Sequence, residues 1–60
     1  MSSTANSSLA ILIARDPEAA ALAEAILTAA GSSLRHYMPV NQDRLVAEAR
    51  AQIDKIRGQE

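Results

Sequence analysis

The chain has 60 residues, a formal net charge of −1 and no cysteine. A chain of this length buries only about 60% of the surface that its unfolded form exposes, so small folds depend on disulfides, a metal or oligomerisation. The composition excludes disulfides, and the near-zero charge gives no general attraction to nucleic acid or anionic lipid. We therefore expect a single domain that associates with a second copy or with a helical protein partner.

The N-terminal residues 1–8 are small and polar, which predicts a disordered arm. They contain no Lys or Arg and so lack the basic start of a secretory signal. The most apolar run, residues 9–14, is far shorter than the roughly 18 residues of a membrane span. We expect a cytoplasmic protein without a membrane contact, with one helical domain over residues 9–58 and a tail at residues 59–60.

Residues 9–14, LAILIA, are compatible with two secondary structures. As a helix, the segment runs from a cap at Ser7 or Ser8 to Arg15, before Pro17 forces a break. As a strand, it is a short apolar run, and so short a run shows no period that separates the two interpretations. The Asp-Pro pair that follows favours the helix, because it can start a new helix in another direction.

With a strand at residues 9–14, the order strand, helix, helix resembles that of ribbon-helix-helix repressors. The resemblance implies a dimer whose paired strands enter the major groove of DNA. Such strands need one face of Arg, Lys, Asn or Gln toward the bases, whereas both faces here are apolar and only Arg15 lies nearby. This fold is the alternative to an all-α one, and its function would be that of a dimeric nucleic-acid-binding regulator. A helical dimer with Arg15, Arg35, Arg44 and Arg50 on one surface is the other form that such a regulator could take.

Residues 16–31 carry the clearest helix signals. Asp16 is a good N-cap, Pro17 suits the first helical position, and Glu18 favours the positive end of the helix dipole. Gly31 supplies the left-handed conformation that ends many helices. The residues between are mostly alanine and aliphatic, and their apolar arc is wider than that of a typical surface helix. This helix is expected to contact neighbours on more than one side.

Residues 32–41 connect this helix to the next. The segment is longer than the about two to eight residues of most helix–helix connections, so we expect it to fold onto the core. Arg35 could hold a phosphate, His36 could titrate near neutral pH, and Tyr37 could stack on a base. Adjacent residues on a turn point in different directions, however, which favours Tyr37 as a cover for the core beside two solvent-exposed side chains.

Residues 41–58 form the second predicted helix, capped by Asn41, with Lys55 and Arg57 in the last turn before Gly58. One face is apolar and the rest is charged, as in a helix with a single buried side. Opposite charges at spacings of three and four are typical of a solvated face. The expected pairs are Arg44 with Glu48, Arg50 with Asp54, and Asp54 with Arg57.

Neither catalysis nor a metal or cofactor is expected. The chain has one histidine and no cysteine, Gly-rich phosphate loop or metal-ligand spacing. We expect an all-α fold: a small antiparallel helical hairpin with a short or kinked N-terminal helical extension, dimerising into a helical bundle. Its expected function is that of a non-enzymatic interaction module, such as an adaptor, an inhibitor or an antitoxin-like regulator. Such a module predicts that residues 9–14 are buried on all sides, whereas a nucleic-acid-binding regulator predicts a polar and basic face near them.

Two sets of residues are candidates for contacts with partners. The expected protein interface is apolar and comes from both helices: Ala19, Leu22, Ala23, Ile26, Leu27, Ala30, Leu45, Ala49, Ile53 and Ile56. The candidates for contact with a ligand or nucleic acid are polar or aromatic: Arg15, Arg35, His36, Tyr37, Arg44 and Arg50.

Overall fold

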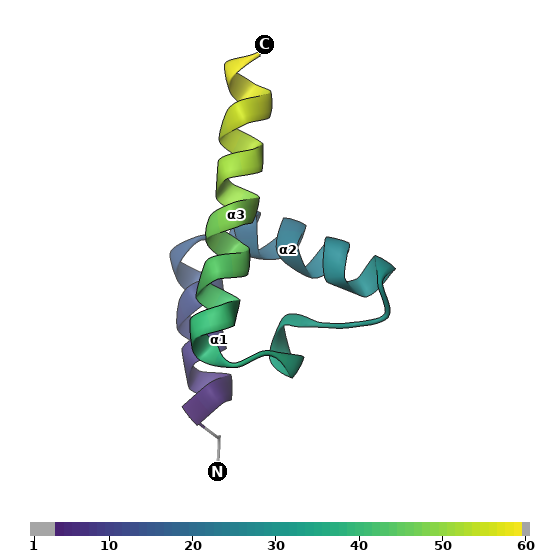
Figure 1. Cartoon of the computed structure of the whole chain (residues 1–60). Helices are drawn as coiled ribbons and strands as arrows, with labels where there is room; N and C mark the ends of the chain where they lie inside the picture. Colours follow the sequence, from purple (N-terminus) through teal and green to yellow (C-terminus); the bar gives the residue numbers. More distant parts are fainter. Residues whose placement is uncertain (1–3, 60) are drawn as a thin grey trace.

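The computed structural model describes residues 4–59, with side chains described for residues 8–59. These residues form α1 (Thr4–Arg15), α2 (Pro17–Ala29), a short 3₁₀ turn η1 (Leu34–His36) and α3 (Pro39–Gly58), with no strand among them (Figure 1). The prediction of an all-α fold is therefore confirmed. The alternative strand at residues 9–14 is wrong, and the ribbon-helix-helix order depended on it.

The N-terminal helix is longer than expected. It begins at Thr4 rather than at a cap on Ser7 or Ser8, and its 12 residues nearly equal the 13 of α2. Of the arm expected over residues 1–8, residues 1–3 lie outside the described residues and the rest is helical. Packing of α1 against both α2 and α3 stabilises a helix whose first residues have only modest helix propensity.

The break between α1 and α2 lies at Asp16, as predicted. This residue has non-helical backbone angles, φ −147° and ψ 75°, and its Oδ1 accepts a hydrogen bond from the Ala19 amide at 3.3 Å. Pro17 occupies the first turn, where its missing N–H has no cost. The chain therefore ends one helix at Arg15 and starts the next at Pro17 in a new direction (Figure 1).

The C-terminal end of α2 also matches the prediction. Gly31 has φ 80°, and its amide donates to the Thr28 carbonyl at 2.9 Å. The Ser32 amide donates to the Leu27 carbonyl at 2.8 Å. Together these bonds form a Schellman motif, which satisfies carbonyls of the last turn and places a left-handed residue after the helix.

The start of α3 differs from the prediction, because the helix begins at Pro39 and not after a cap on Asn41. Met38 is extended, with φ −72° and ψ 155°, and makes no side-chain cap. The proline ring disfavours a helical conformation for the residue before it, and its own fixed φ suits the first helical position. Asn41 lies inside the first turn, where its Oδ1 accepts a hydrogen bond from Arg44 at 3.3 Å.

The arrangement of α2 and α3 is compatible with the predicted helical hairpin. Asp16 at the start of α2 bonds to Arg50, whereas Leu27 near its end lines the same groove as Leu45 near the start of α3. Figure 1 shows that the two axes cross rather than lie side by side, and that the last turns of α3 extend beyond the other helices. The buried hydrophobic core is small: Leu12, Ala19, Ala20, Ala23, Leu34, Val46 and Ala49.

The segment LAILIA is less buried than expected for an interaction module. Only Leu12 is buried, Leu9 is partly buried, and Ile11 and Ile13 are exposed. The expectation that residues 9–14 are buried on all sides is therefore wrong for the single chain. One stripe of α1 is enough to cover its side of α2 and α3.

Replacing Gly31 with alanine should destabilise the fold by about 1 kcal/mol, because an L side chain rarely adopts its φ of 80°. A Cβ atom added there would meet nothing within 4 Å, so the loss is conformational rather than steric. Urea unfolding followed by circular dichroism at one fixed chain concentration measures the change. Gly58→Ala is the matched control: its Cβ position is also open, and alanine favours a helix. Equal losses in the two variants would contradict the role of Gly31.

Candidate functional site in the groove between α2 and α3

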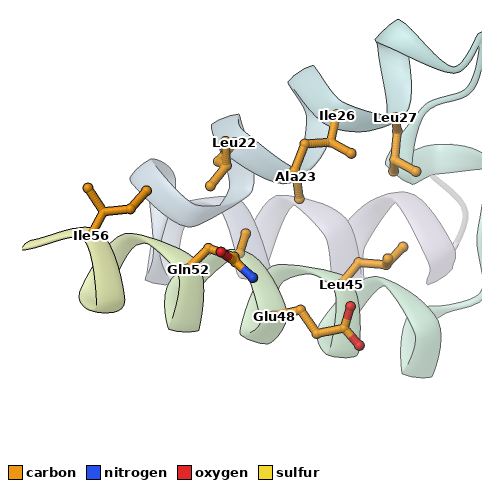
Figure 2. Close-up of a pocket in the computed structure, with 9 residues that line it drawn as sticks. Leu22, Ala23, Ile26, Leu27, Leu45, Glu48, Gln52 and Ile56 are labelled. Atoms are coloured by element: carbon orange, nitrogen blue, oxygen red, sulfur yellow. The ribbon is translucent and has the colours of Figure 1, made fainter.

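An open, mostly apolar hollow of about 390 Å³ lies between α2 and α3, with α1 behind it (Figure 2). We call it the α2–α3 groove. Its polar lining residues, Glu48 and Gln52, both come from α3. Its apolar lining residues come from both helices: Leu22, Ala23, Ile26, Leu27, Leu45, Ala49 and Ile56.

The alanines of the core explain why the groove is open. Ala19, Ala23 and Ala49 are buried, and their small side chains let α2 and α3 approach closely where they cross. They do not fill the space where the axes diverge (Figure 2). The larger side chains at the edges of the groove stay in water: Ile26 is 56% exposed and Ile56 is 59% exposed. Full burial of such a side chain contributes about 1.5–3 kcal/mol, so a partner that covered these residues would gain binding free energy.

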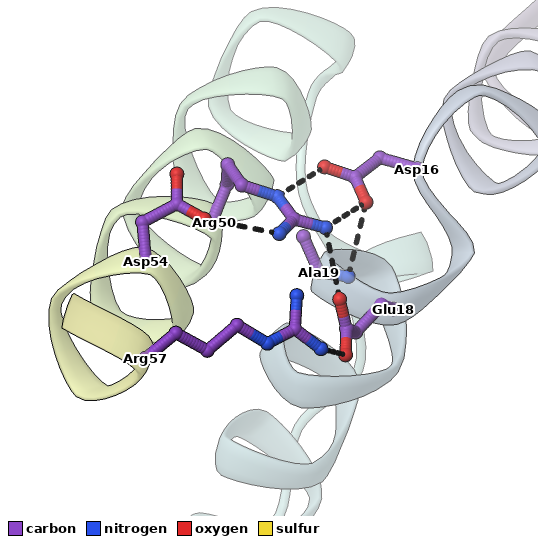
Figure 3. A network of polar contacts seen from close by, with 6 residues as sticks. All are labelled: Asp16, Glu18, Ala19, Arg50, Asp54 and Arg57. Carbon is purple, nitrogen blue, oxygen red and sulfur yellow. Dashed lines mark hydrogen bonds and ion pairs between the residues drawn. The ribbon is translucent and has the colours of Figure 1, made fainter. Parts of the chain in front are cut away.

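Arg50 connects α3 to the start of α2 (Figure 3). Its Nε donates to Asp16 Oδ2 at 3.0 Å and its Nη2 to Asp16 Oδ1 at 2.6 Å. The same guanidinium donates to Glu18 and to Asp54, each at 3.2 Å, and Arg57 also bonds to Glu18. Asp16 therefore caps α2 and binds α3 with a two-bond geometry that lysine could not reproduce.

Of the three ion pairs expected along α3, only one occurs in the part of the chain that the structure describes. Arg50 and Asp54 are paired at 3.2 Å, which confirms that prediction. Arg44 bonds to Asn41 instead of Glu48, and Arg57 pairs with Glu18 instead of Asp54. The interpretation of these charges as one solvated face is therefore wrong for Arg50, which is partly buried against α2, whereas Arg57 also bonds to α2 but stays exposed.

Polar groups at the other end of the hairpin hold the connector onto the core. Glu24 of α2 accepts a bond from the Leu34 amide at 2.8 Å and one from the Ser33 hydroxyl at 2.9 Å. The Gln42 amide group of α3 donates to the Leu34 carbonyl at 2.9 Å, and its side chain is buried. The connector is thus bonded to both helices, and the buried Leu34 side chain closes this end of the core.

These bonds shift the ionisation of three groups. The hydrogen bond from Arg50 is the main cause that holds the pKa of Asp16 below its ordinary value of 3.8, against a smaller opposing effect of desolvation. Bonds from the Leu34 amide and the Ser33 hydroxyl lower the pKa of Glu24 below 4.5. The bond to Asp16 is in turn the main cause that raises the pKa of Arg50.

The predicted interface residues fall into two groups. Ala19, Ala23 and Ala49 are buried inside the single chain, and Ala23 and Ala49 lie at the floor of the groove. The others are partly or fully exposed, and all of them except Ala30 and Ile53 line the α2–α3 groove: Leu22, Ile26, Leu27, Leu45 and Ile56.

The structure does not gather the predicted ligand contacts into one site. Arg15 of α1 lies 3.8 Å from Asp43 at the start of α3, far along the helix from the cluster around Arg50. Arg35 and His36 are exposed on η1, and Tyr37 is partly buried, as its expected role as a cover requires. His36 contacts the Ser32 hydroxyl through Nδ1 at 3.4 Å. Among residues 8–59, no three His, Asp or Glu side chains cluster in the manner of metal ligands.

Two polar residues with structural roles were absent from the predicted sites. Glu24 is the only charged residue of α2 beyond its first turn, a signal that could have suggested a specific partner. Gln42 lies on the apolar side of α3, where an amide needs a hydrogen bond when buried. Their partner, the backbone of Leu34, depends on the path of the connector, which no local sequence pattern specifies.

A scan against protein-family models finds no match for this chain, and comparisons with curated proteins and with solved structures find none either. None of the helices in residues 4–59 has the length and apolar character needed to cross a bilayer.

Acidification below about pH 4 should destabilise the fold, because the pKa values of Asp16 and Glu24 are lowered in the folded chain. Their contribution is fully present above the unfolded pKa values of 3.8 and 4.5, and it is lost as the pH falls through the lower folded values. Thermal unfolding from about pH 7 to pH 2 measures the loss.

Asp16→Asn is the informative variant, since asparagine keeps the N-cap but has no charge for Arg50. It should be less stable at neutral pH and lose less stability on acidification. Asp43→Asn is the control. The ion pair of Asp43 with Arg15 is long, at 3.8 Å, and both side chains are exposed, so its loss should cost little stability. An unchanged pH profile in Asp16→Asn would contradict the assigned role of the Asp16 carboxylate.

Proposed function

We propose that this chain is a non-enzymatic protein interaction module that self-associates or binds a helical partner through the α2–α3 groove. The main observation that supports this proposal is the apolar lining of the groove, with Ile26 and Ile56 exposed at its edges. An amphipathic helix laid into such a groove buries apolar area on both sides. A small adaptor, an inhibitor or an antitoxin-like regulator would use the surface in this way.

The chain exposes more surface than a compact fold of its length, which supports the proposal. Its accessible surface is 4302 Å². A compact folded chain of this length exposes about 3,800 Å². The radius of gyration, 11.9 Å, also exceeds the about 10 Å expected for a compact domain of this length. A fold completed by a second chain has this kind of surplus surface.

The outer face of α2 continues the apolar surface of the groove. Leu22 is partly exposed and Ile26 is exposed, and Glu24, the one charged residue beyond the first turn, is bonded to the connector. Exposed alanines recur at every fourth position and would allow another helix to approach closely: Ala21, Ala25 and Ala29. A helix placed here would therefore meet no unpaired charge on α2.

The alternative function, a helical regulator that binds nucleic acid, has less support. Arg50 and Arg57 are held by carboxylates of α2, and Arg15 lies beside Asp43. A surface that follows phosphates needs cations that are not already neutralised. These three arginines therefore favour a structural role over a phosphate-binding one, and the two exposed arginines without an ion pair in residues 8–59, Arg35 and Arg44, lie on different elements.

Ile26→Asp should weaken association about 100-fold, because it places a charge in the apolar groove. Ile11→Asp is the matched control: Ile11 is 60% exposed, against 56% for Ile26, and it lies on α1, outside the groove lining. Sedimentation equilibrium measures self-association, and helicity measured by circular dichroism shows whether each variant still folds. Equal weakening by both substitutions, or by neither, would contradict the groove as the binding surface.

A further inference from the structure

Helix α3 carries two charges that form no ion pair within the described chain: Glu48, which lines the α2–α3 groove, and Lys55, seven residues further along the helix. Glu48 and Lys55 are both exposed, and neither forms an ion pair within residues 8–59. Among the other charged side chains of α3, Asp43 pairs with Arg15, Arg50 with Asp54, and Arg57 with Glu18, whereas Arg44 bonds to the neutral Asn41. Glu48 and Lys55 are opposite in sign and available to a partner.

Their spacing on α3 is self-complementary. Seven residues are close to two full turns, so Glu48 and Lys55 lie on the same side of the helix, about 10 Å apart along its axis. A second α3 running antiparallel, with a two-fold axis between Ala51 and Gln52, brings each Glu48 opposite Lys55 of the other copy. A parallel copy in register would instead place like charges opposite each other.

We propose that the occupant of the α2–α3 groove is α3 of a second copy, antiparallel to the first and related to it by a two-fold axis. This inference rests on the proposed function and specifies its partner. The two-fold symmetry produces the Glu48–Lys55 ion pair twice, as an isologous interface requires.

The same register also accounts for Ile56 at the edge of the groove. With the axis between Ala51 and Gln52, Ile56 of one copy lies at the level of Ala47 in the other, next to Leu45 at the end of the groove where α2 and α3 diverge (Figure 2). A standard interface buries about 800 Å² of each partner. This is a modest part of the 4302 Å² that the single chain exposes.

Charge reversal in the 60-residue chain tests this arrangement. Glu48→Lys alone and Lys55→Glu alone each place like charges opposite each other twice, so each should weaken the homodimer about tenfold. An equimolar mixture of the two variants should regain wild-type association, because the heterodimer has opposite charges at both positions. The double variant E48K/K55E should also regain it as a homodimer. Analytical ultracentrifugation at low salt measures all four samples.

Arg15→Glu is the control for a charge reversal outside the groove, and it should associate like the wild type. If both single variants dimerise as the wild type does while Ile26→Asp does not, the groove is the interface but the antiparallel register is wrong. If the mixture fails to recover association, the ion pair between copies is wrong. A wild-type chain that stays monomeric at every concentration overturns the second copy as occupant, and capture of a foreign helix by that monomer would keep the proposed function.

Discussion

The close approach of α2 and α3 through alanines is the constraint on which the rest of the structure depends. Ala19 and Ala23 meet the other helix with almost no side chain, so the backbones come together where they cross. Alanine contributes little apolar area, and four of the seven buried core residues are alanines. The single chain therefore gains a defined geometry from this contact but only a small hydrophobic stabilisation.

Hydrogen bonds and ion pairs at both ends of this contact add to its small hydrophobic stabilisation. At one end, Asp16 caps α2 and accepts two bonds from Arg50. At the other, Glu24 and Gln42 hold the backbone of Leu34 from opposite sides. These bonds specify how the helices cross, because a charged or amide group loses its partner if either helix slides. Toward Leu27 of α2 and Leu45 of α3 the helices diverge, and the apolar groove is the result (Figure 2).

Sequence patterns identified the elements better than their arrangement. Asp16, Pro17 and Gly31 predicted the ends of α2, because caps and left-handed glycines act locally. Pro39 overrode the expected cap at Asn41, since a proline at the first helical position is a stronger constraint than an available side-chain oxygen. The apolar residues of the groove were also recognised from their helical spacing. The sequence did not show which of these residues are buried within the single chain. Their burial depends on how α2 and α3 cross, and the crossing involves contacts between residues more than thirty positions apart.

The ion pairs show the same difference between contacts within one helix and contacts between helices. Arg50 and Asp54 are four residues apart on one helix, so their pair could be predicted. The bonds of Arg50 to Asp16 and of Arg57 to Glu18 join different helices and needed the fold. Glu48 and Lys55 form no ion pair among the described residues, and they are the charges of α3 that we propose to pair with a second copy.

The most direct test of this account is the helicity of the wild-type chain over a dilution series, with its molar mass measured on the same samples. If association completes a small alanine core, dimers at high concentration should give way to monomers of lower helicity, between about 500 μM and 1 μM, as mass action requires. A chain that is monomeric and equally helical at every concentration would contradict the account. The core within one chain would then be sufficient for the fold.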